Sequence, residues 1–211
     1  LAAERGEALA RTITAKRKVD HILLQAREQR KQPATDDKVL TSWNGLMIEG
    51  LAHVGRVTEE PQFIEAAARA ADAILEHMQD DSGLLHTMRN GQAGVPGFLE
   101  DYAMFAAGLL ALHEATQDQK WLDQAQRLTD LAIGKFAAED GGYFDTLEGQ
   151  ADLFVRTRSL YDGAMPSGNS QMVHNLVTLH ERTGEQAYLT RAVRDLRSFA
   201  TALRRQGANM T

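Results

Sequence analysis

The sequence predicts an all-α protein made of about three αα-hairpins joined by short extended segments. Apolar residues recur at helical spacing through most of the chain. A pattern of Thr, four residues, an aromatic, a branched aliphatic, two residues and Ala begins at Thr58, Thr116 and Thr183. A second, glycine-containing signature follows two of these copies, at 81–87 and 140–146. A motif that returns between two helical patterns indicates a repeated helical hairpin.

The chain begins with a basic amphipathic helix, expected over residues 5–31 and ended by Pro33. Each hairpin should pair two helices, over 42–57 with 62–79, 98–115 with 119–137, and 168–182 with 186–205. Asn90-Gly91 predicts a turn after the first signature, and residues 152–159 alternate like a strand after the second. The third hairpin stops near its own copy of the signature. We therefore expect residues 1–211 to form one partial domain of a longer protein.

Repeated hairpins can stack into an open solenoid or close into a ring. Common helical solenoid repeats are about 34–47 residues long, whereas these copies begin roughly 60 residues apart. The extra length lies at one end, between the hairpins. This is the arrangement of an α/α-toroid, in which the first helices form an inner ring and the connecting segments build a pocket over its mouth. The sequence therefore favours a partial α/α-toroid.

Composition narrows the classes of function. A net charge of -6 argues against a nucleic-acid binder, because phosphate affinity needs a basic surface. No apolar run is long enough for a membrane span, and the absence of cysteine fits a cytoplasmic location and excludes thiol catalysis. The histidines lack metal-binding spacing, Ser167 to Ser170 is not a nucleophile elbow, and no phosphate-cradling glycine loop occurs. We expect no metal and no cofactor.

Carboxylates gather where the first helix of each hairpin starts. The predicted pocket residues are Asp37, Trp43 and Asn44 at the first start, Glu100, Asp101 and Tyr102 at the second, Asp162, Ser167 and Asn169 at the third, and Asp145 in the second signature. Carboxylates and amides bind sugar hydroxyls, aromatic rings stack on sugar faces, and two carboxyls can act as acid and base. We expect Asp101 and Asp162 to be catalytic and the others to bind substrate. Taken singly, each residue could instead be a helix cap or part of the core. His86 is a further candidate for ligand contact.

Four motifs occur in order along the chain: D-D-K-V-L-T-S-W-N-G-L-M-I at 36–48, G-F-L-E-D-Y-A at 97–103, G-G-Y-F-D-T at 141–146 and D-G-A-M-P-S-G-N-S at 162–170. Together they resemble the helical part of the YyaL family, whose animal members are called spermatogenesis-associated proteins. The resemblance implies an N-terminal thioredoxin-like domain, not contained in this chain, and a six-hairpin toroid similar to N-acylglucosamine 2-epimerases and six-hairpin glycosidases. This chain would hold about half of that toroid. The catalytic histidines of the epimerases cannot be placed on this sequence.

The sequence leaves three functions open. The first is a carbohydrate-active enzyme, a hydrolase or an isomerase, with a small sugar as its ligand. The second is a non-catalytic binding module that accompanies a thioredoxin-like redox domain, and the third is a purely structural toroid. We expect neither a nucleic acid nor a membrane as partner. A half-ring would expose the faces that normally pack on further hairpins, so self-association is also expected.

Overall fold

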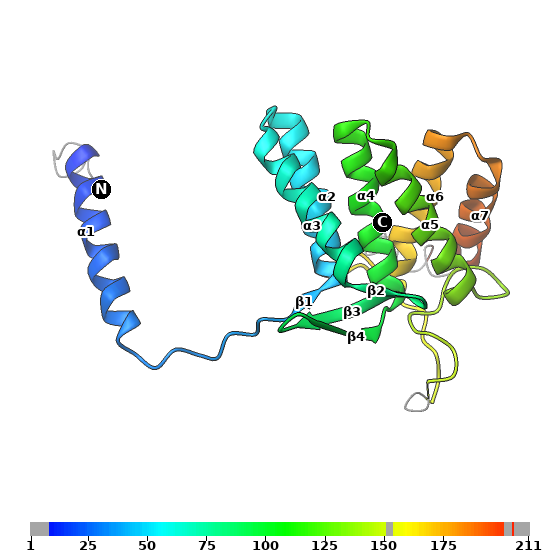
Figure 1. Ribbon diagram of the computed structural model, residues 1–211, viewed down its shortest axis with the longest axis horizontal. Helices are drawn as coiled ribbons and strands as arrows, with labels where there is room; N and C mark the ends of the chain where they lie inside the picture. The colour runs from blue at the N-terminus through cyan, green and yellow to red at the C-terminus, as the bar shows by residue number, and fades with distance from the viewer. Residues whose placement is uncertain (1–8, 151–153, 201–203, 205–211) are drawn as a thin grey trace. The chain divides into compact units, whose positions relative to one another are not determined.

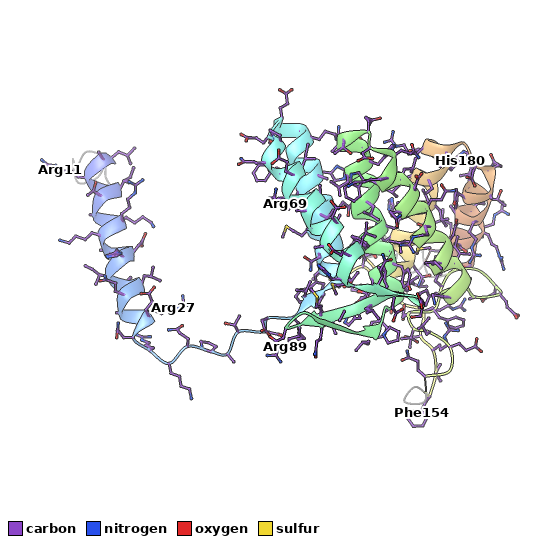
Figure 2. The ribbon with its side chains drawn as sticks, viewed as in Figure 1. Arg11, Arg27, Arg69, Arg89, Phe154 and His180 are labelled. Atoms are coloured by element: carbon purple, nitrogen blue, oxygen red, sulfur yellow. The ribbon has the colours of Figure 1, made fainter. Side chains whose placement is uncertain are left out.

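The computed structural model describes residues 9–150, 154–200 and 204, in two units, 1–37 and 38–211, which we describe separately. The described part of the first unit contains α1 (Leu9–Glu28), an exposed basic helix with Arg11 and Arg27 near its two ends (Figure 2). The side-chain amide of Gln32 donates to the carbonyl oxygens of Arg27, in the last turn, and Arg30, just after the helix. This helix confirms the first predicted element. The single domain expected over 1–211 stays a prediction.

The second unit contains the three predicted hairpins. They are α2 (Thr41–Thr58) with α3 (Pro61–His77), α4 (Leu99–Thr116) with α5 (Gln119–Phe136), and α6 (Gly168–Thr183) with α7 (Gln186–Ser198). Each helix packs on its hairpin partner, and the first helices also pack on one another, α2 on α4 and α4 on α6. The helices stand side by side with the strands gathered at one end (Figure 1). No helix among the described residues is long and apolar enough to cross a membrane.

The repeated motif forms the same turn in every hairpin. The hydroxyls of Thr58, Thr116 and Thr183 each donate to the carbonyl oxygen four residues earlier. The next residue is left-handed in each case, and its N–H closes the helix end. The alanines of the motif are buried where the second helix meets the first. The motif is therefore a hairpin signature, as predicted.

Helix α4 forms the centre of the unit. Its side chains from Asp101 to Leu112 are all buried, because α2, α3, α5 and α6 pack around it. The run of small and apolar residues from Ala103 to Leu112 explains why this helix can be covered on all sides. The start of α4 is thus fixed in the middle of the end where the first helices begin.

Four antiparallel strands cover that end: β1 (Val39–Leu40), β2 (Gln79–Asp80), β3 (Gly83–Arg89) and β4 (Gln92–Pro96). Strand β3 pairs with the other three, with Thr87 opposite both Leu40 and Gly94. Asn90 and Gly91 both have positive φ, which confirms the predicted Asn-Gly turn between β3 and β4. The strands hold the segments that lead into α2 and α4.

The strand predicted over 152–159 is wrong for its described part, because residues 154–159 form no strand. One backbone bond, from Asp145 N to Thr157 O at 2.9 Å, attaches this loop to the second signature. The guanidinium of Arg156 adds hydrogen bonds to the carbonyl oxygen of Thr146. One backbone bond and several side-chain bonds, rather than a strand ladder, therefore anchor the loop. Residues 152 and 153 lie outside the described part.

Candidate functional site

A cavity of ≈ 650 Å³ lies at the end of the unit where the first helices begin. Its walls come from all three hairpins: Trp43 of α2, Phe98 and Glu100 at the start of α4, Asp145 and Thr146 of the second signature, and Ser159, Tyr161, Ala164, Met165, Pro166, Ser167 and Gly168 before and at the start of α6. Four predicted pocket residues line it, namely Trp43, Glu100, Asp145 and Ser167. The structure thus brings together residues that are far apart in the sequence.

Glu100 presents a half-buried carboxyl to this cavity. Burial raises the pKa of Glu100, the neighbouring Asp101 raises it further, and His86 opposes the shift. Within the described part of the chain, no group donates a hydrogen bond to this carboxyl. The group is therefore free to bond to a ligand, and it holds its proton to a higher pH than an ordinary glutamate does.

Asp101, the next residue, points into the protein and is fully buried. Its Oδ1 accepts the N–H of Ser42 at 3.0 Å, and its Oδ2 accepts the N–H of Phe98 at 2.9 Å and contacts Nδ1 of His86 at 2.9 Å. Burial raises the pKa of Asp101, while these hydrogen bonds oppose the shift. Both oxygens are engaged with the protein, so the geometry gives Asp101 a positioning role. Its predicted catalytic role stays a prediction.

His86 of β3 lies between Asp101 and the ring of Phe98, whose centroid is 4.8 Å from that of the imidazole. With the proton on Nδ1, the other ring nitrogen is an acceptor without a described partner. His86, Glu100 and Asp101 offer ligand atoms within 4.8 Å of one another. However, Asp101 already accepts three hydrogen bonds. Only His86 and Glu100 of this cluster then remain as ligands, whereas a catalytic zinc site has three protein ligands. The cluster fits proton exchange better than metal binding.

Asp145 both lines the cavity and holds its wall. Its carboxylate accepts hydrogen bonds from the Thr157 hydroxyl at 2.7 Å and from the Ser159 backbone and hydroxyl at 3.0 and 2.8 Å. Its backbone carbonyl accepts the N–H of Leu99 at the start of α4. Asp145 therefore connects the loop before α6 to the start of α4.

Asp162 fixes the start of α6 and is not among the residues that line the cavity. Its carboxylate accepts the N–H of Ser167 at 2.6 Å and the hydroxyl of Ser170 at 3.2 Å. The Ser167 hydroxyl in turn accepts the N–H of Ser170 and caps the helix. These bonds place Ser167 and the preceding turn at the cavity wall, whereas the predicted catalytic contact of Asp162 stays a prediction.

Three other predicted substrate-binding residues serve the scaffold. The Tyr102 hydroxyl accepts the N–H of Leu84 at 2.9 Å, and the Asn44 amide donates to the carbonyl of Leu40. The fully buried Asn169 bonds both backbone groups of Tyr143. None of the three lines the cavity, and Asp37 belongs to the N-terminal unit. Substrate contact by these four residues stays a prediction.

Tyr161 is the main cavity residue that the sequence interpretation missed. Its side chain is 62% exposed and lines the cavity, as does Trp43, which is 60% exposed. Met165 and Pro166 add apolar surface from the same loop. An aromatic residue directly before the D-G-A-M-P-S-G-N-S motif was the signal that could have identified Tyr161.

A smaller groove of ≈ 270 Å³ runs between α2, α4 and α6 and includes Glu49, His53 and His174. Burial raises the pKa of Glu49, and the two imidazoles oppose the shift. The groove has no phenylalanine, tyrosine or tryptophan in its described lining. It therefore offers a sugar less stacking surface than the cavity at the mouth.

The hairpins, the short strands and the carboxylate-lined cavity define a partial α/α-toroid, and comparison with solved structures confirms this fold. A GH76 α-mannanase from Bacteroides thetaiotaomicron has a TM-score of 0.65 at 21% identity, covering 80% of this chain and 47% of that protein. Cellobiose 2-epimerase from Spirochaeta thermophila has a TM-score of 0.63 at 17% identity, covering 78% of this chain and 43% of that protein.

The chain belongs to the beta-L-arabinofuranosidase GH127 catalytic-domain family, whose model matches residues 45–202. It is 39% identical over 195 residues to Spermatogenesis-associated protein 20 of Homo sapiens, covering 87% of this chain and 25% of that protein. It is 31% identical over 179 residues to Uncharacterized protein B0495.5 of Caenorhabditis elegans, covering 81% and 24%. The predicted resemblance to spermatogenesis-associated proteins is confirmed. The chain spans about a quarter of the length of these relatives.

Proposed function

We propose that this domain binds a carbohydrate in the cavity at its mouth and acts on it as a hydrolase or an isomerase, with Glu100 as the proton-exchanging group. The observation that carries the proposal is the half-buried Glu100 carboxyl, which lines the cavity and has no hydrogen-bond donor among the described residues. The family and the fold support the carbohydrate class.

In a hydrolase, a carboxyl with a raised pKa protonates the leaving oxygen while a second carboxylate attacks the sugar or activates water. Glu100 suits the first role because burial favours its neutral form. Asp145 lines the same cavity, but both of its carboxylate oxygens accept hydrogen bonds from Thr157 and Ser159. Asp145 therefore holds the wall, and the second carboxylate stays unassigned. In an isomerase, Glu100 would move a proton at the carbon beside the sugar carbonyl. Asp101, the next residue, positions Glu100 in either reaction.

A solved relative provides a parallel for the acidic pair. An α-1,6-mannanase of Salegentibacter, with a TM-score of 0.60 at 18% identity, is described as inactive when two consecutive aspartates are replaced by asparagine. This chain also has two consecutive acids, Glu100 and Asp101, at the start of α4. In this chain, one acid of the pair faces the cavity and the other fixes its surroundings.

The test uses Glu100→Gln, which keeps the size of the side chain and breaks no described hydrogen bond of the protein. Sugar binding is measured by thermal shift and turnover by product analysis over a panel of mono- and disaccharides. We expect the variant to bind sugar and to lose at least about a hundredfold in turnover, the lower range for a general acid or base. Glu65→Gln, at an exposed carboxyl of α3 without a described partner, is the matched control. Undiminished turnover in Glu100→Gln would remove the residue from the reaction.

A second candidate is a non-catalytic binding module that accompanies a thioredoxin-like domain. It is favoured by the use of three carboxylates, Asp101, Asp145 and Asp162, to hold loops and helix starts. A module of this kind would show no sugar turnover, and Glu100→Gln would alter the binding of a redox partner instead. The same sugar panel therefore separates the two candidates.

A further inference from the structure

Two exposed aromatic side chains line the cavity from different hairpins. Trp43 stands in the first turn of α2, and Tyr161 lies in the loop before α6. A ligand that stacks on an exposed aromatic ring removes apolar surface from water, which favours binding. Each ring can stack against one sugar face. The pair therefore offers stacking surface for more than one sugar unit.

The cavity volume agrees with a ligand of that size. At ≈ 650 Å³ it falls within the range of about 300–1,000 Å³ that is typical of pockets for drug-sized molecules. A disaccharide is a ligand of this class, whereas a single pyranose would leave much of the space to water. Met165 and Pro166 add apolar wall beside the two aromatic rings.

The charges on the cavity wall all have one sign. Glu100 and Asp145 line it, and no lysine, arginine or histidine does so among the described residues. Two guanidiniums belong to the adjoining loop. Arg158 pairs with Asp140, and Arg156 directs its guanidinium to the backbone carbonyl of Thr146 and stacks over Phe144. A negative group on a ligand would therefore meet two carboxylates at the wall, and no cationic side chain is among the described lining residues.

We propose that the cavity selects neutral and amino sugars of at least two units and rejects uronic acids and other anionic sugars. This inference rests on the proposed carbohydrate function. It adds which ligand charge the cavity accepts and how many sugar units the ligand must have. An amino group would pair with Glu100 or Asp145, and two adjacent sugar rings would cover Trp43 and Tyr161.

Charge selection is tested by titration calorimetry on the full chain at low salt and about pH 8, where carboxyl side chains are ordinarily ionised. The probes are matched neutral, amino and uronic disaccharides of the gluco, galacto and manno series. We expect the amino or neutral member to bind at least about tenfold more tightly than the uronic member of its series. The difference should shrink in Glu100→Gln, which removes one of the two wall charges.

Length selection is tested with Trp43→Ala and Tyr161→Ala. Each should weaken disaccharide binding by about threefold to tenfold, the range for one aromatic contact, and should affect the monosaccharide less. Phe154→Ala is the matched control, because Phe154 is fully exposed at the loop tip and does not line the cavity (Figure 2).

The outcomes are distinguishable. Uronic disaccharides that bind as tightly as neutral ones would overturn the charge selection. Equal loss of mono- and disaccharide binding in both aromatic variants, or no loss in either, would overturn the minimum length. Both results leave the carbohydrate function standing. If no sugar of any charge or length binds, the proposed function fails together with the inference.

Discussion

The carboxylate of Asp101 in α4 lies 3.0 Å from the backbone nitrogen of Ser42 in α2, 59 positions away in the sequence. The other oxygen of the same carboxylate accepts the N–H of Phe98 and contacts His86. One fully buried side chain thus fixes the starts of two inner helices and the ring of the histidine. The direction of Glu100 depends on this arrangement, because Glu100 precedes Asp101 in the first turn of α4.

We predict that Asp101→Asn destabilises the protein by about 1–3 kcal/mol, because an amide nitrogen cannot accept the N–H that one carboxylate oxygen accepts now. A buried donor would remain unpaired, whichever way the amide points. The free energy of unfolding, measured in urea, checks this. Asp81→Asn, at an exposed carboxyl without a described partner, should stay within about 0.5 kcal/mol of the parent. A loss no larger than that of the control would contradict the prediction.

Most of the helical framework could be predicted from the sequence, because its signals are local. The hydroxyl of Thr116 bonds the carbonyl of Leu112 in the turn that the motif predicted, and the other two copies do the same. The loop at 154–159 could not be predicted in this way. Its conformation depends on Asp145 and Thr146, which lie several residues upstream and are reached by side-chain bonds. Alternation alone does not distinguish such anchoring from a strand.

The candidate site could be predicted only in part. The motifs indicated that the helix starts converge, but not which side chain of each start faces the cavity. Glu100 and Asp101 are adjacent, and consecutive helical residues point about 100° apart. Glu100 faces the cavity and Asp101 faces the core. The sequence pattern would be the same if the two directions were exchanged. Asp162 and Asn169 were similarly assigned to the ligand, although their polar groups complete hydrogen bonds within the scaffold.

Two glycines of α2 give a matched test of the contact between α2 and α4. A Cβ at Gly45 would lie 2.5 Å from the carbonyl carbon of Met104, whereas a Cβ at Gly50 would have nothing within 4 Å. We predict that Gly45→Ala destabilises the protein by about 1–3 kcal/mol, because the helices must separate. Gly50→Ala should stabilise it by about 0.5–1 kcal/mol through helix propensity. Chemical unfolding of both variants checks the opposite signs, and the same sign for both would be evidence against this packing.

The Glu100 carboxyl should reduce stability at neutral pH. Burial raises the folded-state pKa of Glu100 above its ordinary value of 4.5, so the folded protein favours the neutral form. The neutral carboxyl makes its full contribution to the free energy of unfolding at a pH below the pKa of Glu100 in the unfolded state. That contribution is lost as the pH rises through the pKa of Glu100 in the folded state. Glu100→Gln, which cannot ionise, should therefore raise Tm at about pH 8 and give no such gain at about pH 4. A gain that is independent of pH would point to a different cause, and Glu65→Gln serves as the control.

Helix α2 exposes an apolar face that nothing in the described structure covers. Met47, Val54 and Val57 are between 46% and 73% exposed, and they follow one another at helical spacing with Gly50 after Met47. The buried residues of α2, including Gly45, Ile48 and Ala52, lie on the opposite side of the helix. A continuous apolar stripe of this kind on an inner helix is suited to packing against another helix.

We therefore predict that the 211-residue chain self-associates through this stripe of α2. Light scattering over a dilution series should give a mass above that of one chain at high concentration and a fall toward one chain on dilution. The double variant Met47→Lys and Val54→Lys should remain a single chain over the same range, because two charges would have to be buried without partners. Gln62→Lys and Ala73→Lys, at exposed positions of α3, introduce the same charge and should leave the association unchanged. A parent chain that stays monomeric at every concentration, or a control that dissociates as the stripe variant does, would show that the α2 face is not the contact.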